Sequence, residues 1–253
     1  MVQDPEILVR KANQLSSVDL LNIVQCHDLP KTNDHSVRIH LLSASEVPRN
    51  AQEALWTLFD ENMGKLAAGT SLATSKGEKL EELFDPATRF AIYTSETSES
   101  PALELDNLEG HKLLGFASIR FDTEDTLDSQ EYEDGIRAAV VYIYELQVAS
   151  HARGLGLGRR LLSNCETLGK GTGMQKAMLT CLKKNGQALR FYMHNGYSPD
   201  EIDPTMLIQQ EQSRKLRSSR GKTNQLNHWV NGEQADTKAT SHIDYRILSK
   251  QLK

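Results

Sequence analysis

The residues of this sequence that could do chemistry are concentrated in residues 142–162, which read YIYELQVASHARGLGLGRRLL. An apolar and aromatic run ends in a loop with glycines at positions 154, 156 and 158, and an amphipathic helix is predicted to follow at once. Glycines let the backbone approach a ligand closely and direct successive N–H groups at it, while the helix N-terminus adds its dipole. The loop is therefore predicted to bind an anion, most often a phosphate.

Two familiar phosphate-binding loops do not fit this pattern. A Walker A loop requires GxxxxGK[ST], and the Lys-Ser/Thr pair is missing here. The dinucleotide fingerprint GxGxxG requires a third glycine, but the count from Gly154 reaches Arg159 and the count from Gly156 reaches Leu161. The pattern that remains, Arg-x-x-Gly-x-Gly after a strand, resembles the pyrophosphate-binding loop of the GNAT acetyltransferases.

A second motif strengthens this resemblance. Residues 185–197 read NGQALRFYMHNGY, which is similar to the GNAT pattern N-x-x-A-x-x-F-Y-x-x-x-G-[FY]. Asn185 is predicted to hydrogen-bond the pantetheine arm of the cofactor and Ala188 to leave room beside it. Phe191 is expected to pack in the core, while Tyr192 faces the thiol. The two motifs together imply an α/β chain with the GNAT fold, a mixed and mostly antiparallel sheet flanked by helices, with acetyl-CoA as cosubstrate.

Acetyl transfer to an amine requires a neutral nucleophile, an oriented thioester and a proton donor for the departing thiolate. Glu145 is the odd residue of an otherwise apolar and aromatic strand, and a buried carboxylate is costly without a purpose. We expect it to act as the general base through a water; a structural role beside an arginine is the alternative. Tyr192 could protonate the thiolate, or serve only in core packing. A bulge in this strand would leave backbone N–H groups at residues 146–148 free to polarise the thioester oxygen.

The rest of the chain must position these residues. Apolar spacing predicts an N-terminal helix over residues 5–26, broken near residues 16–17, and a helix over residues 45–63 with Ser45 as its N-cap. Three antiparallel strands are expected to precede the unit of strand, glycine-rich loop and helix. The remaining elements are strands at 37–42, 90–94, 112–121, 138–148, 176–182, near 197 and at 245–248, and helices over 154–168 and 186–194.

Two segments differ in composition from the rest. Residues 209–241 hold few apolar side chains and a basic run, which predicts a flexible insertion; a nuclear-import or phosphate-contacting segment is the alternative. Residues 122–134 carry acids and no base, and they connect two predicted strands. We expect a helical extension at 1–35, packed on one acetyltransferase domain at 36–253.

Composition excludes several classes of protein. No apolar run approaches the ~20 residues that a membrane-spanning helix needs. The three cysteines lie far apart and the eight histidines form no HExxH motif, so neither a disulfide framework nor a metal site is predicted. The net charge of −5 argues against direct nucleic-acid binding by the chain as a whole. A reducing compartment, the cytoplasm and the nucleus, is the expected location.

A closer resemblance rests on four further stretches. Residues 142–147 (YIYELQ), RFD at 120–122, MLT at 178–180 and DYRILS at 244–249 are similar to the NatD family of N-terminal α-acetyltransferases. The match covers about residues 40–200 and the final strand. Members of this family acetylate the N-terminal serine of histones 4 and 2A, whose chains begin Ser-Gly-Arg-Gly. The resemblance implies histone tails as the substrate and a monomer that acts without an auxiliary subunit, a nucleic acid or a membrane.

The resemblance assigns site residues position by position. The catalytic glutamate falls on Glu145, beside Tyr192 from the second motif. The acetyl-CoA contacts fall on Leu146, Gln147, Val148, Gly154, Leu155, Gly156, Leu157, Gly158, Arg159 and Asn185, and from the loop pattern itself we expect Arg153 to add positive charge there. The substrate contacts fall on Asp122, Tyr144, Thr180 and Tyr245, and we expect Tyr142 to join them as a wall of the substrate pocket.

The predicted substrate contacts match the chemistry of a peptide that begins Ser-Gly-Arg-Gly. Asp122 and the acidic connection would lie beside a substrate whose third residue is arginine, although a solvated hairpin loop is the alternative for those acids. Tyr142, Tyr144 and Tyr245 could wall a narrow pocket for Ser-Gly. An α-amine titrates near ~7.8 and a lysine amine near ~10.4, so the α-amine is about 3–4 kcal/mol easier to present neutral. This favours an α-amine without excluding lysine.

One segment departs from the family pattern. After residues 62–64 the family usually shows a tyrosine and then a Ser-Trp-Gly-Trp stretch that covers the peptide, whereas Ala67 and Leu72 stand here in place of aromatic residues. Two alternatives to histone acetylation therefore stay open. One is a GNAT enzyme that acetylates lysine or small-molecule amines, and the other is an acetyl-CoA-binding protein with impaired catalysis.

Overall fold

One mixed sheet organises the chain, with the strand order β1-β2-β3-β4-β5-β7-β6. Neighbouring strands are antiparallel except β4 and β5, which pair in parallel. The computed structural model describes residues 4–25, 37–95, 105, 108, 112–126, 137–220 and 242–252. The strands are β1 (Val37–Ser43), β2 (Arg89–Ser95), β3 (Leu113–Asp125), β4 (Arg137–Val148), β5 (Lys176–Leu182), β6 (Ser198–Pro199) and β7 (Tyr245–Gln251).

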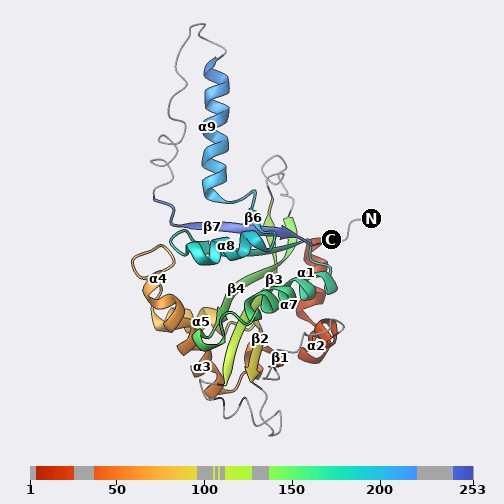
Figure 1. Ribbon diagram of the computed structural model, residues 1–253. Helices are drawn as coiled ribbons and strands as arrows, with labels where there is room; N and C mark the ends of the chain where they lie inside the picture. Colours follow the sequence, from red (N-terminus) through yellow and green to blue (C-terminus); the bar gives the residue numbers. More distant parts are fainter. Residues whose placement is uncertain are drawn as a thin grey trace.

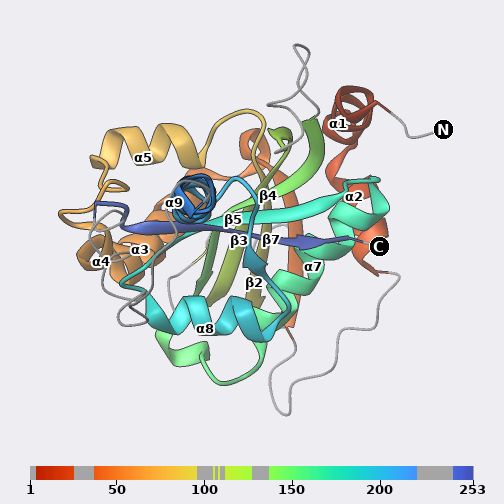
Figure 2. The same ribbon diagram turned by 90° about the horizontal axis from the view of Figure 1, so that it is seen from above.

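Helices cover both faces of this sheet. In Figure 2, α5 lies on one side of the sheet, and α7 and α8 lie on the other. Within the described ranges, no helix is both long and apolar enough to span a bilayer. The helices are α1 (Pro5–Asn13), α2 (Ser17–Gln25), α3 (Arg49–Phe59), α4 (Lys65–Ala67), α5 (Lys76–Leu83), α7 (Leu157–Gly171), α8 (Gly186–His194) and α9 (Pro204–Arg220).

The core lies between the sheet and its helices. Phe90 and Tyr93 of β2 and Phe116 of β3 are the largest fully buried side chains. The helix α7 packs so closely on β4 that a Cβ atom added at Gly169 would lie 2.6 Å from Val141 Cγ1. The glycine is therefore what allows the helix that follows the glycine-rich loop to lie directly on the strand that carries Glu145.

The N-terminal helix is broken where the sequence predicts it. Asp4 caps α1 by accepting a hydrogen bond from the Glu6 amide, and residues 14–16 separate α1 from α2. The two helices bury Ala12, Leu20 and Val24 and pack against β1, β3, β4 and α7. The division of the chain into an extension at 1–35 and a domain at 36–253 stays a prediction.

Two predicted helix starts are wrong by one turn. The helix expected from Ser45 begins at Arg49, because residues 44–46 form a short 3₁₀ turn, which Ser43 and Glu46 cap as a capping box. The helix expected from Gly154 begins at Leu157, because Gly154 and Gly156 have φ angles of 81° and 76°. Such left-handed residues cannot continue a right-handed helix.

The predicted insertion at 209–241 begins within a helix. Residues 204–220 form α9, which stands away from the sheet in Figure 1, and residues 221–241 lie outside the described part of the chain. The flexibility of the insertion stays a prediction. The start of α9 is fixed by the fully buried Asp203, whose carboxylate accepts hydrogen bonds from the Met206 amide, the Ile247 amide and Arg246 Nε. One carboxylate thus ties α9 to β7 and gives the helix a defined origin.

Candidate functional site

The sheet opens beside Glu145. The parallel ladder between β4 and β5 ends at the pair Ile143–Leu179, although β4 continues to Val148. On the other side of β4, Ser118 pairs with Glu145 and Ile119 with Ile143, so Tyr144 is an extra residue and forms a bulge. Backbone groups of β4 beyond Ile143 therefore face a gap, which belongs to a cleft of about 950 Å³.

The glycine-rich loop lies at one end of this cleft. Six of the seven residues at 153–159 line it, whereas the side chain of Leu155 points away and is 51% exposed. The N-terminus of α7 follows Gly156 directly, so its amide groups and its dipole are available to an anion there. Arg153 donates to Val148 O and to Asn62 Oδ1, and Arg159 donates to Asn195 Oδ1.

Glu145 lies in the middle of the cleft wall and is 9% exposed. Its Oε1 atom lies 2.6 Å from Lys79 Nζ, and its Oε2 atom accepts a hydrogen bond of 2.8 Å from Gln147 Nε2. Burial raises the pKa of Glu145, and the Lys79 ammonium group opposes that rise. The charged partner of Glu145 is thus a lysine, not the arginine that the sequence suggested as an alternative.

A chain of hydrogen bonds links Glu145 to the glycine-rich loop. Gln147 Oε1 accepts a hydrogen bond of 3.0 Å from Asn62 Nδ2, and Asn62 Nδ2 also donates to Val148 O at 3.2 Å. Asn62 belongs to a π-helical turn, Asp60–Gly64, of the kind often found at functional sites. The Ala149 amide donates to Leu114 O on the β3 side, and amide directions alternate along a strand, so the Gln147 amide also faces β3. The amides of Leu146 and Val148 point to the other side, toward the cleft.

The second motif forms the wall opposite Glu145. Asn185 lines the cleft and caps α8 by accepting a hydrogen bond from the Ala188 amide. Phe191 packs against the core and also lines the cleft. Tyr192 is buried against the rings of Phe191 and Tyr197, at centroid distances of 5.2 and 5.9 Å. Burial raises the pKa of Tyr192, which keeps its hydroxyl protonated and able to donate.

Three of the predicted substrate contacts lie together in the cleft. The hydroxyl of Tyr142 lies 2.6 Å from Thr180 Oγ1, and the rings of Tyr142 and Tyr144 are 5.1 Å apart. Burial raises the pKa of Tyr142 to about 12. The guanidinium carbon of Arg120 lies 4.2 Å above the Tyr144 ring and fixes it.

The other two predicted contacts do not line the cleft. Asp122 is exposed on β3, and Tyr245 is half-buried at the start of β7, opposite Leu182. Besides Glu145, the carboxylates of the described residues that line the cleft are Glu82 and Glu124, which the sequence did not single out individually. Burial raises the pKa of Glu124, and the nearby Asp122 adds to that rise. Of the acidic connection, residues 127–134 lie outside the described ranges.

The segment that replaces the expected aromatic lid borders the cleft. Ala67 and Leu72 both line it, and Leu72 remains 39% exposed. The Ser71 amide donates to Asp244 Oδ2 at 2.7 Å, and Lys184 Nζ donates to Ala68 O at 3.1 Å. These contacts hold the segment against β7 and the loop after β5 without any ring over the cleft.

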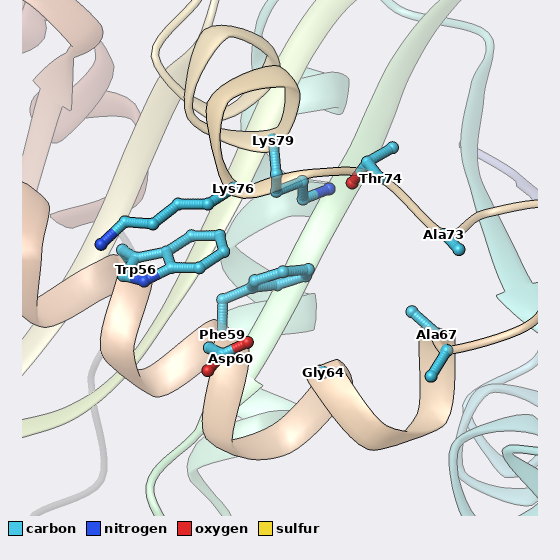
Figure 3. A pocket seen from close by; sticks show the side chains of 10 residues that line it. Trp56, Phe59, Asp60, Gly64, Ala67, Ala73, Thr74, Lys76 and Lys79 are labelled. Atoms are coloured by element: carbon cyan, nitrogen blue, oxygen red, sulfur yellow. The ribbon is translucent and has the colours of Figure 1, made fainter.

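A second cavity of about 280 Å³ adjoins the cleft behind this segment (Figure 3). It shares four wall residues with the cleft, and its own walls include Trp56, Asp60, Gly64 and Lys76. The residues common to both cavities are Phe59, Ala67, Thr74 and Lys79. In the described ranges no cluster of three or more His, Cys, Asp or Glu side chains could hold a metal ion.

The sequence did not identify three residues that line the cleft, Lys79, Glu82 and Asn62, as site residues. Lys79 and Glu82 lie on α5, a helix that was not predicted because glycine and threonine-rich residues precede it. The available signal was the capping pattern Ser75-x-x-Glu78, in which the Glu78 amide donates to the Ser75 hydroxyl and the Ser75 amide to the Glu78 carboxylate.

Comparison with solved structures supports the fold. Arabidopsis thaliana NAA60 in complex with a bisubstrate analogue matches with a TM-score of 0.51 and 12% identity, over 86% of this chain and all of that one. Ard1 from Thermoplasma volcanium covers 86% of this chain and 98% of that one at 12% identity, with a TM-score of 0.46. The PaiA N-acetyltransferase from Thermoplasma acidophilum in complex with coenzyme A covers 85% and 99% at 13% identity, with a TM-score of 0.45.

Comparison with family models identifies the chain more directly. Residues 56–197 match the model of the acetyltransferase (GNAT) family. This range is more than half of the sequence, and it contains the cleft, the glycine-rich loop and the second motif. Enzymes of this family use acetyl-CoA as the acetyl donor. The chain therefore belongs to the GNAT family of acetyltransferases.

Proposed function

We propose that this enzyme transfers the acetyl group to the N-terminal α-amine of a protein that begins Ser-Gly-Arg-Gly, as histones 4 and 2A do. The observation that carries the proposal is the position of the buried Glu145 carboxylate beside Tyr142, Tyr144 and Thr180 in one cleft. Glu82 and Glu124 line the same cleft and provide negative charge for a basic third residue. The resemblance to the NatD family points to the same acceptor.

The chemical steps follow from the same geometry. Glu145 accepts a proton from the substrate α-ammonium group through a water, and the neutral amine then attacks the thioester carbonyl. The backbone N–H groups of Leu146 and Val148 point away from β3 toward the gap between β4 and β5, where they stabilise the oxyanion of the tetrahedral intermediate. Its collapse breaks the carbon–sulfur bond and releases the coenzyme A thiolate, which takes a proton from the Tyr192 hydroxyl. The nitrogen then loses its second proton as the amide forms, and that proton returns Tyr192 to its neutral form, while Glu145 releases its own proton to solvent.

The coenzyme is held at the other end of the cleft in this proposal. The amides of the glycine-rich loop and of the first turn of α7 bind the diphosphate, together with Arg153 and Arg159. The Asn185 side chain binds the pantetheine arm. Because the loop and Glu145 border the same cleft, a coenzyme seated on the loop can extend its thioester toward the carboxylate.

The acceptor is tested with two peptides that begin Ser-Gly-Arg-Gly and contain one lysine. One peptide carries a free N-terminus, and the other is blocked there by a formyl group. We expect acetylation of the free peptide only, with the acetyl group on the α-nitrogen in tandem mass spectra. Acetylation of the lysine in the blocked peptide would support the lysine alternative, and coenzyme binding without turnover of either peptide would support impaired catalysis.

The coenzyme site is tested by Gly156→Ala. Since Gly156 has a φ angle of 76°, an alanine there costs about 1–2 kcal/mol or forces the loop to change shape. We expect the Kd for coenzyme A to rise about tenfold in titration calorimetry, because the loop amides lose their alignment. Gly173→Ala is the matched control: its φ angle is 81°, but it lies beyond the opposite end of α7. An unchanged Kd for Gly156→Ala would contradict the assignment of the loop.

A further inference from the structure

Lys79 is the most deeply buried charged group of the cleft that the proposed chemistry does not use. It lies on α5, is 7% exposed, and contributes to the walls of both cavities. Figure 3 shows its side chain passing over the Phe59 ring, with Nζ 4.7 Å from the ring centroid. Beyond the ring, Nζ lies 2.6 Å from Glu145 Oε1 and 2.6 Å from Glu82 Oε1. The ammonium group is thus held between two carboxylates.

We propose that Lys79 is a positioning residue, which keeps Glu145 ionised and fixes the orientation of its carboxylate in the resting enzyme. This inference rests on the proposed function, in which Glu145 is the general base. A general base must be deprotonated before substrate arrives, yet burial in a sheet favours the neutral acid. The ammonium group at 2.6 Å opposes that preference, because it stabilises the ionised carboxylate.

The orientation of the carboxylate is fixed from two directions. Lys79 binds Oε1, and Gln147 binds Oε2 at 2.8 Å, so rotation of the carboxylate breaks at least one of these contacts. An ionised carboxylate offers about four lone-pair positions, so two remain for a water or an amine. Gln147 is in turn held by Asn62. The direction of these remaining lone pairs is therefore set by α5 and by the π-helical turn together.

The titratable groups that face Glu145 come from two packed elements. Lys79 and Glu82 project from α5, and Tyr192 from α8. Glu82 raises the pKa of Glu145, and the neutral Tyr192 adds no charge. Burial lowers the pKa of Lys79, but the two carboxylates outweigh that effect, and its pKa lies above the usual range. Lys79 thus stays charged at the pH values at which the enzyme works. Its charge favours the ionised form of Glu145, which burial disfavours.

The experiment is Lys79→Met, which keeps the apolar stem over Phe59 and removes the charge. Without the ammonium group the pKa of Glu145 rises, and the base is active only above its pKa. The acid limb of the kcat/KM profile should therefore move to higher pH by about one unit or more. Activity near pH 7 should fall about tenfold and recover at high pH. Lys79→Arg, which restores a positive charge, should return the limb toward its original position.

A matched control is available elsewhere in the chain. Lys250 pairs with Glu166 at 2.8 Å and lies 5.8 Å from the centroid of the Tyr197 ring, an arrangement similar to that of Lys79 but outside the cleft. Lys250→Met should leave the pH profile unchanged. If Lys79→Met only lowers activity by the same factor at every pH, Lys79 is merely structural and the proposal is wrong.

A second readout does not depend on any substrate. In protein with ¹³C-labelled glutamate side chains, the carboxyl resonance that Glu145→Gln removes can be followed during a pH titration. Its midpoint should be higher in Lys79→Met than in the unaltered enzyme, and an equal midpoint would overturn the proposal. This titration needs no acceptor, so its result holds even if the enzyme acetylates a different amine. Failure of this inference can therefore be distinguished from failure of the proposed function. Should Lys79→Met not fold, Lys79→Gln provides the same comparison.

Discussion

Replacing Glu145 by glutamine is expected to lower kcat by about 100-fold or more, the usual effect of removing a general base. Glutamine has nearly the same shape, can still contact Lys79 and Gln147, and cannot accept a proton from an ammonium group. The loss should therefore appear in turnover, with little change in the KM for acetyl-CoA. Steady-state kinetics with a free Ser-Gly-Arg-Gly peptide measure it.

The control for this substitution is Glu166→Gln. Glu166 is also a largely buried glutamate paired with a lysine, at 2.8 Å from Lys250, but it lies outside the cleft. The Glu166→Gln enzyme should lose some stability and keep the kcat of the unaltered enzyme. If Glu145→Gln retains the rate of the unaltered enzyme, Glu145 is structural and the proposed mechanism fails. Calorimetry with coenzyme A shows in either case whether the cleft is intact.

The second large effect is expected on stability, from Asp203→Ala. The Asp203 carboxylate is 0% exposed and accepts three hydrogen bonds that join α9 to β7. Its removal leaves two partly buried amides and the largely buried Arg246 without their acceptor. Breaking a buried ion pair by removing one partner costs 3–5 kcal/mol, and the partial exposure of Arg246 favours the lower end. We expect a loss of about 3 kcal/mol and a Tm about 6–12 °C lower.

Urea denaturation followed by circular dichroism tests this expectation. The comparison variant is Asp125→Ala, which removes an exposed pair with Arg137 at 3.5 Å and should cost less than about 1 kcal/mol. Equal stabilities of the two variants would show that the Asp203 contacts add nothing to folding. Because Tyr245 lies two residues from the Asp203 contact at Ile247, the same variant should also loosen the start of β7.

The fold and the two motifs that line the cleft could be predicted because they are local patterns. The glycine-rich loop and the motif beginning at Asn185 each depend on a few residues near one another in the sequence, and runs of apolar residues marked the strands that build the cleft. The lone glutamate of β4 could be noticed for the same reason, since it contradicts its apolar surroundings.

The partners of Glu145 could not be predicted, because they come from distant parts of the chain. Lys79 lies 66 positions before Glu145, in a helix whose apolar spacing is weak, and an isolated lysine in a polar segment reads as a surface residue. Asn62 acts through a π-helical turn, and the sequence gives no signal for that geometry. The placement of Tyr245 beside the cleft instead of in its wall depends on the register of β7 against β5.

The four-pair ladder between β4 and β5 has a consequence for how the two halves of the sheet hold together. Beyond Ile143 no strand of the described residues pairs with this side of β4, which leaves an unfinished strand edge. A ligand with amide groups along its length can complete that edge much as an added strand does. Such a ligand would join the N-terminal and C-terminal halves of the sheet, and its binding free energy would add to the stability of the folded chain.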